Sequence, residues 1–169
     1  IVLGLNCLPV KDTGSIFIID SKDETRLQMI AHRHLPKPLV QRCKHIKFGE
    51  CLCGKAADSQ KIVFKNCVDH DHSVNYSGIE AHGHYCIPVV FVHKTLAVIN
   101  LYLEAGSQKS DEDEQFLVLV GDAVASMIHS HHVEENAQKI FTAVDQAGEA
   151  ILISDPDGVI EYTNAAFSE

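Results

Sequence analysis

Short apolar runs separated by turn-forming residues dominate the first two thirds of the chain. These runs are rich in β-branched and aromatic side chains, which is typical of strands in a sheet. The predicted strands are residues 14–20, 26–32, 61–64, 84–92 and 96–102. The run 84–92 is apolar throughout, so we expect a central strand there, with 96–102 as its hairpin partner across a turn at 93–95. Prolines at 36 and 38 predict a break in regular structure. Residues 49–58 predict a turn that leads into a short helix.

The hydrophobic period changes after residue 110. Phe116, Val120, Ala123 and Met127 recur at spacings of four, three and four, which predicts an amphipathic helix. The pattern weakens in a polar stretch near 131–136, next to a helix break expected near 129–132, and resumes toward about residue 146. A helix this long could pair with its copy in a homodimer, as helices with a seven-residue repeat do, or could pack only on its own sheet. We favour the dimer.

The last twenty residues predict a separate small element. Residues 150–154 and 159–162 are apolar and flank an Asp-Pro-Asp-Gly turn, and 164–167 resemble a helix start. A lone hairpin cannot bury a core. We therefore expect three parts: a globular domain at 1–131, a helical linker at 132–147, and the first segment of a second domain at 148–169.

Composition narrows the class of protein. The chain has 169 residues, 46% of them hydrophobic, and a formal net charge of −9. This acidity argues against nucleic acid as a partner, because phosphate contacts require clustered Lys and Arg. No apolar run approaches the ~20 residues that span a bilayer, and the first residues lack the basic stretch of a secretory signal. We expect a cytoplasmic protein with no direct membrane contact and with reduced thiols.

Cysteine and histidine are frequent and clustered, and they supply the candidate site. Cys51 and Cys53 lie where a turn enters a helix, and His82, His84 and Cys86 alternate along a predicted strand. Alternate residues of a strand share a face, so the last three would point the same way. Thiolates and imidazoles suit zinc or an iron–sulfur centre. The sequence therefore predicts a metal site at these five residues, with redox sensing or plain packing as alternatives.

Two further histidine groups carry weaker signals. Asp69-His70-Asp71-His72 alternates carboxylate and imidazole, which could bind zinc but on a polar loop is more often solvated. His129, His131 and His132 lie at the expected helix break, where they suit the negative end of a helix dipole.

Several segments resemble the GAF domain family. Residues 49–57, Gly-Glu-Cys-Leu-Cys-Gly-Lys-Ala-Ala, resemble the stretch that follows its first hairpin. Residues 85–89, with Pro88, resemble its aromatic-x-apolar-Pro-apolar strand, and 96–101 resemble the next strand. The resemblance covers about residues 1–131, without the family's first helix. It implies an α+β fold: a central antiparallel sheet of about six strands, with flanking helices on one face and a pocket under loops on the other.

The tail resembles the start of a PAS domain. Residues 151–167 carry an apolar strand, an Asp-x-Asp-Gly turn, an apolar-x-Tyr strand and an Asn-x-Ala-Phe helix start. A GAF domain followed by a PAS domain implies a bacterial sensor, such as a histidine kinase or a diguanylate cyclase. The chain would then sense a small ligand, a metal or a redox event, and would pass the signal through its C-terminal helix to the PAS and output domains of the same chain.

Other activities of GAF domains have weaker support in these residues. The Asn-Lys-x-x-x-Phe-x-x-x-Asp-Glu pattern of cyclic-nucleotide binding is missing, and no Cys precedes a His as in bilin-binding members. Free methionine-R-sulfoxide reductases share a Gly-x-Cys-Gly-x-Ala stretch that residues 52–56 resemble, but their His-Ile-Ala-Cys-Asp segment has no match. We therefore expect a non-enzymatic module. A reductase-like enzyme and a ligand-free dimerisation module remain the alternatives.

Overall fold

A computed structural model describes residues 10–68 and 79–167, which fall into two compact units divided after Ser126. The first unit carries a six-stranded sheet and the second a two-stranded hairpin. The strands are β1 (Val10–Asp20), β2 (Asp23–Arg33), β3 (His45–Lys47), β4 (Val63–Lys65), β5 (His82–Phe91), β6 (Lys94–Glu104), β7 (Leu152–Ser154) and β8 (Ile160–Thr163). The helices are α1 (Lys37–Arg42), α2 (Cys51–Ser59), α3 (Asp111–Asp145) and the 3-10 turn η2 (Ala165–Phe167).

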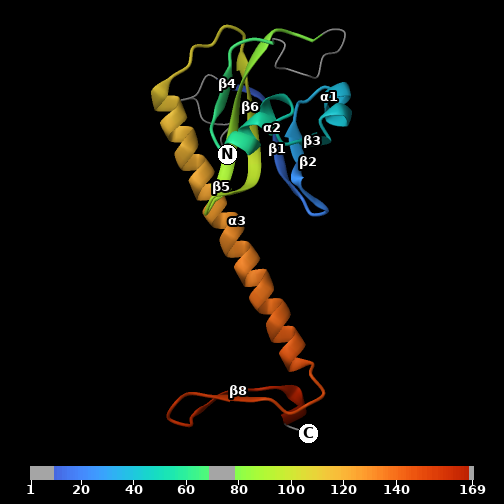
Figure 1. Cartoon of the computed structure of the whole chain (residues 1–169), viewed down its shortest axis with the longest axis vertical. Coiled ribbons are helices and arrows are strands. Elements are labelled where there is room, and N and C mark those ends of the chain that lie inside the picture. The colour runs from blue at the N-terminus through green and yellow to red at the C-terminus, as the bar shows by residue number, and fades with distance from the viewer. Residues whose placement is uncertain (1–9, 69–78, 168–169) are drawn as a thin grey trace. The chain divides into compact units, whose positions relative to one another are not determined.

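The large sheet is antiparallel throughout, with strand order β3-β2-β1-β6-β5-β4 (Figure 1). Its centre is the pair β1–β6, in which Ile16 faces Ile99. β5 is buried along most of its length, as its continuous apolar run predicts. Pro88 is tolerated in β5 because the pairing with β4 ends at Cys86, so the missing N–H lies beyond the β4 ladder. The predicted α+β fold with a six-stranded antiparallel sheet is confirmed.

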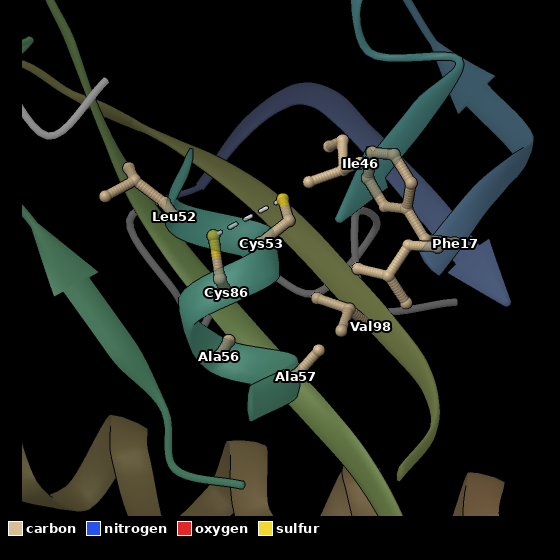
Figure 2. Close-up of a cluster of buried hydrophobic side chains, with 9 residues drawn as sticks. Phe17, Ile46, Leu52, Cys53, Ala56, Ala57, Cys86 and Val98 are labelled. Carbon is tan, nitrogen blue, oxygen red and sulfur yellow. Dashed lines mark hydrogen bonds between the residues drawn. The ribbon is translucent and has the colours of Figure 1, made fainter. Parts of the chain in front are cut away.

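One face of the sheet is covered by α1 and α2. Leu52, Cys53, Ala56 and Ala57 of α2 pack on a cluster from the sheet, and Figure 2 shows these side chains meeting at the core. The sheet side chains in this cluster are Phe17, Leu27, Ile46, Cys86 and Val98. The small alanines let α2 lie close to the strands. The end of α2 is tied to the β5–β6 hairpin by the Thr95 hydroxyl, which donates to the Ala57 carbonyl at 2.8 Å.

The other face carries α3. Leu117, Gly121 and Ala125 are its buried residues, spaced four apart on one side of the helix. A Cβ added to Gly121 would lie 3.1 Å from the Pro88 carbonyl oxygen and 3.5 Å from Ile87 Cγ2. The expectation of helices on one face and a pocket under loops on the other is therefore wrong. Helices cover both faces, because the apolar side chains of β5 and β6 alternate to both sides.

α3 is one continuous helix of 35 residues, so the expected break at 129–132 is wrong. The polar stretch keeps the backbone hydrogen bonds of the helix, since none of its residues is a strong helix breaker. Of the helices described, α3 alone is long and apolar enough to span a membrane by length and composition. Its burial against the protein's own sheet, at Leu117, Gly121 and Ala125, accounts for part of that apolar character.

Two short elements escaped prediction. The prolines at 36 and 38 do not end regular structure but begin it, because Pro is accommodated in the first turn of a helix, where the N–H has no intrahelical partner. α1 follows, with Leu39 buried against Leu35 and Tyr102. β3 then pairs with β2 through only three residues, too few to show a period in the sequence.

The second unit contains the predicted hairpin, in which Ile153 pairs with Tyr162. Asn164 is buried and holds the segment that leads into this hairpin. Its side-chain Oδ1 accepts a hydrogen bond from the Ile151 N–H at 2.8 Å. The Nδ2 of the same side chain donates to the backbone carbonyls of Val144, Ala147 and Glu149, at 3.3, 3.3 and 2.9 Å. Carbonyls at the end of α3 therefore gain a side-chain partner, as helix termini require.

Candidate functional site

The candidate site is a pair of cysteines in the core beneath α2. Cys53 comes from the first turn of α2 and Cys86 from the middle of β5, and their Sγ atoms lie 3.7 Å apart (Figure 2). Both side chains are buried. Cys53 reaches the sheet because its helix sits close, with Gly54 packed against the backbone at Lys47. Figure 2 shows the two sulfur atoms pointing toward one another between the helix and the strand.

Asn100 of β6 connects the cysteine pair to other buried polar groups. Its Oδ1 lies 2.9 Å from His84 Nδ1 and accepts from the Cys86 thiol at 3.5 Å. Its Nδ2 donates to Ser15 Oγ at 3.3 Å. All four side chains are buried. A polar cluster in a core is stable only when its members satisfy one another, because an unmet buried polar group costs about 1–3 kcal/mol.

A small cavity of about 20 Å³ adjoins this cluster. About 10–15 Å³ is enough for one water molecule, so the space fits a water and not an organic ligand. Four cysteines line it, together with polar and apolar residues of α1, α2 and the sheet. The lining comprises Ser15, Phe17, Met29, Leu35, Leu39, Cys43, Ile46, Cys51, Leu52, Cys53, His84, Cys86, Asn100 and Tyr102.

The thiols of Cys53 and Cys43 are held in their neutral form. The hydrogen bond with Cys86 and burial raise the pKa of the Cys53 thiol well above its ordinary value. Burial raises the pKa of Cys43 to about 12, and the neighbouring thiols of Cys51 and Cys53 add to this. A neutral thiol is a weak nucleophile, so these side chains react slowly at neutral pH.

The five residues predicted to bind metal are only partly brought together. Cys53, His84 and Cys86 share the polar cluster and the cavity, and Cys51 also lines the cavity. His82 stacks with Tyr102, with ring centroids 4.9 Å apart, and its Nδ1 lies 2.6 Å from the Glu80 carbonyl. Across residues 10–68 and 79–167, no three His, Cys, Asp or Glu side chains gather as a metal site requires. Zinc or an iron–sulfur centre stays a prediction from the sequence.

The remaining candidates that the structure describes do not line this cavity. Asp69-His70-Asp71-His72 lies outside the described residues. Cys67 is exposed. His131 lies 3.6 Å from Glu135 on an exposed turn of α3, an ordinary ion pair between helix residues four apart when the imidazole is protonated.

Asn100, Ser15 and Tyr102 were not predicted as site residues from the sequence. Asn100 was detectable in principle, as the one amide inside an otherwise apolar strand. Ser15 and Tyr102 carry no such signal, because their roles depend on strand pairing: Ser15 faces Asn100, and Tyr102 faces His84.

β5 connects the cysteine pair to α3. Cys86 points toward α2, and the next residues, Ile87 and Pro88, contact α3 at Gly121. Neighbouring residues of a strand point to opposite faces, so one strand touches both the thiol pair and the long helix. β5 therefore has contacts with the thiol pair on one face and with α3 on the other.

The sequence profile of the GAF domain matches residues 7–129. The chain belongs to the GAF domain family. This family consists of signal-sensing modules, and the matched segment covers the whole six-stranded sheet, α1, α2 and the sheet-packed part of α3. A search of curated proteins found no match.

Solved GAF domains share this fold. The chain is similar to the GAF domain of a phosphoenolpyruvate-protein phosphotransferase from Coxiella burnetii, at 20% identity and a TM-score of 0.62, with 74% of this chain and 76% of that one covered. It is similar to the second GAF domain of DevS from Mycobacterium smegmatis, at 11% identity and TM-score 0.58, covering 75% and 86%. It is also similar to free methionine-R-sulfoxide reductase from Neisseria meningitidis, at 17% identity and TM-score 0.56, covering 68% and 65%. Likeness at this identity shows the fold alone.

Proposed function

We propose that this GAF domain is a sensory module that detects a thiol-directed signal at Cys53 and Cys86 and transmits it through β5 to α3. The observation that carries the proposal is the 3.7 Å separation of the two buried Sγ atoms, next to the polar cluster around Asn100. Hydrophobic residues of the same volume would fill this core without the cost of satisfying buried polar groups. A cluster kept at that cost supports a role beyond packing.

The simplest signal is oxidation of the pair to a disulfide. The two thiols lose two protons and two electrons, and an S–S bond forms. A hydroperoxide is a suitable oxidant, because its O–O bond breaks and it leaves as an alcohol and water. The Sγ atoms would approach by about 1.7 Å to reach the ~2.05 Å bond length. Because the pKa of Cys53 is raised, we expect slow oxidation at neutral pH and faster oxidation as pH rises.

The transmission step follows from the position of β5. Closing the disulfide draws α2 and β5 together at Cys86, and the adjoining Ile87 and Pro88 contact Gly121. Gly121 has no side chain between β5 and the helix backbone, so a shift of β5 would act directly on the backbone of α3. The change is best described as a population shift between two packings of α3.

This role fits a wider context that we infer from the sequence. The hairpin β7–β8 and the turn at 165–167 are what the start of a PAS domain would supply. We propose that α3 links the GAF domain to a PAS domain and an output domain in a cytoplasmic bacterial sensor, such as a histidine kinase or a diguanylate cyclase. A reducing compartment would keep both cysteines of the pair in the reduced thiol form until an oxidant arrives.

A catalytic role has less support. Two cysteines that can form a disulfide are what a reductase-like mechanism would use, and structures of such reductases share the fold. However, a nucleophilic cysteine needs a lowered pKa, whereas the pKa of Cys53 is raised. The cavity of about 20 Å³ also leaves no room for an amino-acid substrate. We therefore propose that the module is not an enzyme.

The test combines peptide mapping with metal analysis of the tag-free 169-residue chain, purified anaerobically. The reduced protein is treated with a hydroperoxide and digested without reductant, and linked peptides are identified by mass spectrometry. We expect a Cys53–Cys86 disulfide that a dithiol reverses, and no stoichiometric metal. The matched control is Cys67→Ser, which removes an exposed thiol and leaves the pair unchanged.

Two outcomes would overturn the proposal. Oxidation only at other cysteines would remove the pair as the sensing element. A stoichiometric metal that disappears in Cys51→Ser/Cys53→Ser would instead establish the metal site predicted from the sequence, at Cys51, Cys53, His82, His84 and Cys86. An absorption spectrum of the purified chain would then separate zinc, which is colourless, from an iron–sulfur centre.

A further inference from the structure

An open surface pocket of about 350 Å³, which we call the vestibule, adjoins the thiol cavity. Leu39 and Tyr102 line both the vestibule and the cavity. These two side chains are only 2% and 7% exposed, and they form the wall between the two spaces. The other residues of the vestibule are mostly polar: Lys11, Thr13, His34, Glu80 and His82.

One face of β5 leads from the vestibule to the thiol pair. His82 lines the vestibule, whereas His84 and Cys86 line the thiol cavity. The three residues alternate along the strand, so they share a face, and about 13 Å separates the Cα atoms of the first and the last. The Tyr102 ring contacts both imidazoles, with centroids 4.9 Å from His82 and 4.4 Å from His84. The rings therefore form a continuous row from the vestibule to the cavity.

We propose that the vestibule is the route by which a small neutral hydroperoxide, hydrogen peroxide in the simplest case, reaches Cys53 and Cys86. Leu39 and Tyr102 set the size limit. This inference rests on the proposed thiol function and names the oxidant that the pair accepts. One thiol attacks an oxygen atom of hydrogen peroxide, the O–O bond breaks, and the thiol proton leaves with the second oxygen as water. The sulfenic acid then condenses with the other thiol, which gives the disulfide and a second water.

The size of the thiol cavity favours the smallest oxidants. Its volume of about 20 Å³ holds one water molecule. Hydrogen peroxide is only one oxygen atom larger than water, so a small movement of the Tyr102 or Leu39 side chain would admit it. An aryl hydroperoxide carries a whole ring besides, and it could enter only if the wall were unpacked.

The charges around the vestibule favour a neutral oxidant. Lys11 forms a salt bridge with Glu104 at 3.2 Å, and Glu80 adds a further carboxylate. His34 Nδ1 lies 2.7 Å from the Asp12 carbonyl oxygen and 3.4 Å from the Asp12 carboxylate. Because carboxylates already match these basic groups, an anionic oxidant gains no net attraction here. The hydroxyl, imidazole and carboxylate groups can instead hydrogen-bond a neutral hydroperoxide.

The test compares two thiol oxidation rates within the same reduced chain: that of the buried pair and that of the exposed Cys67. Samples are quenched by alkylation and analysed by mass spectrometry. In the wild type, we expect hydrogen peroxide to form the Cys53–Cys86 disulfide. With cumene hydroperoxide, the rate of the pair relative to Cys67 should be roughly tenfold lower or less. Cys67 corrects for the intrinsic reactivity of each oxidant, so the ratio reports access.

Two variants change the route in opposite directions. Thr13→Trp fills the vestibule and should slow the reaction of the pair with hydrogen peroxide roughly fivefold, whereas Lys22→Trp, in an exposed turn, should not. Tyr102→Ala opens the wall and should speed the reaction with cumene hydroperoxide roughly tenfold. Its matched control, Leu52→Ala, enlarges the thiol cavity at a residue that does not line the vestibule, and should keep the preference for hydrogen peroxide. Unfolding cannot mimic Thr13→Trp, because unfolding would speed oxidation.

The entry route and the thiol function fail by different results. If neither oxidant links Cys53 to Cys86 while Cys67 reacts, both proposals are overturned. If the disulfide forms in the wild type but Thr13→Trp and Tyr102→Ala leave the ratios unchanged, the entry route is overturned and the thiol function stands. Equal ratios for the two oxidants in the wild type would overturn the size limit.

Discussion

Oxidation of Cys53 and Cys86 should stabilise the GAF fold by an amount that follows from their separation in sequence. The two residues are 33 positions apart, and a disulfide between them closes a loop of that length. In the chain-entropy treatment, a loop of this size removes enough freedom from the unfolded chain to stabilise the fold by about 3.7 kcal/mol at 25 °C.

Strain in the folded state reduces this gain. The Sγ atoms must approach by about 1.7 Å, and α2 or β5 must move to allow it. We therefore expect a net stabilisation of about 2–3.5 kcal/mol, which corresponds to a rise in Tm of roughly 10 °C for a chain of this size.

The assay is thermal unfolding of the reduced and oxidised chain, followed by circular dichroism. Cys67→Ser is used as the background, because this exposed thiol would otherwise cross-link separate molecules. In that background, Cys86→Ala should abolish the difference between oxidised and reduced protein. Cys43→Ala should retain it, although it removes another cysteine that lines the same cavity.

Two results would refute this reasoning. The first is a chain in which mass spectrometry finds the Cys53–Cys86 disulfide but Tm stays the same or falls, which would mean that strain outweighs the loop entropy. The second is a rise in Tm that survives in Cys86→Ala, because some other linkage would then be responsible.

Three further predictions concern the packing and protonation of the site. Gly54→Ala would gain about 1 kcal/mol of helix propensity, but the new Cβ collides with the Lys47 carbonyl oxygen, so we expect a net loss of about 2 kcal/mol in chemical denaturation. Asn100→Ala removes the acceptor of His84 Nδ1 and should cost about 2–3 kcal/mol, measured in the same way. The folded-state pKa of Cys43, about 12, exceeds the ordinary thiol pKa of 9.0, so the stability that Cys43 contributes is complete below about pH 9 and is lost as pH rises toward 12. Unfolding titrations should show this loss, and Cys43→Ala should lessen it.

Patterns that repeat along the sequence predicted most of the fold. The apolar runs identified β1, β2, β5 and β6, because a strand of ten or more residues shows its period clearly. α1 and β3 were missed because six and three residues are too few to show a period. The equally short β4 was predicted from its apolar run at 61–64. The expected break in α3 was wrong because a polar stretch changes the surface of a helix without removing its backbone hydrogen bonds.

The site was only partly predictable. The regular spacing of His82, His84 and Cys86 correctly indicated a shared strand, but it could not show that Cys86 would face Cys53 of α2. The contact between Cys53 and Cys86 depends on how closely α2 packs on the sheet. Asn100, which joins the histidine and the thiol, lies on a neighbouring strand and is brought in only by register.

The most direct test of the account is hydrogen–deuterium exchange of α3 in the reduced chain and in the chain carrying the Cys53–Cys86 disulfide. Because β5 contacts both the thiol pair and Gly121, we predict that oxidation changes the exchange of α3 amides around Gly121, and that Cys86→Ala abolishes the change. If the disulfide forms and every α3 amide exchanges at the same rate in both states, the thiol pair is not coupled to the helix, and the proposed sensory mechanism is contradicted.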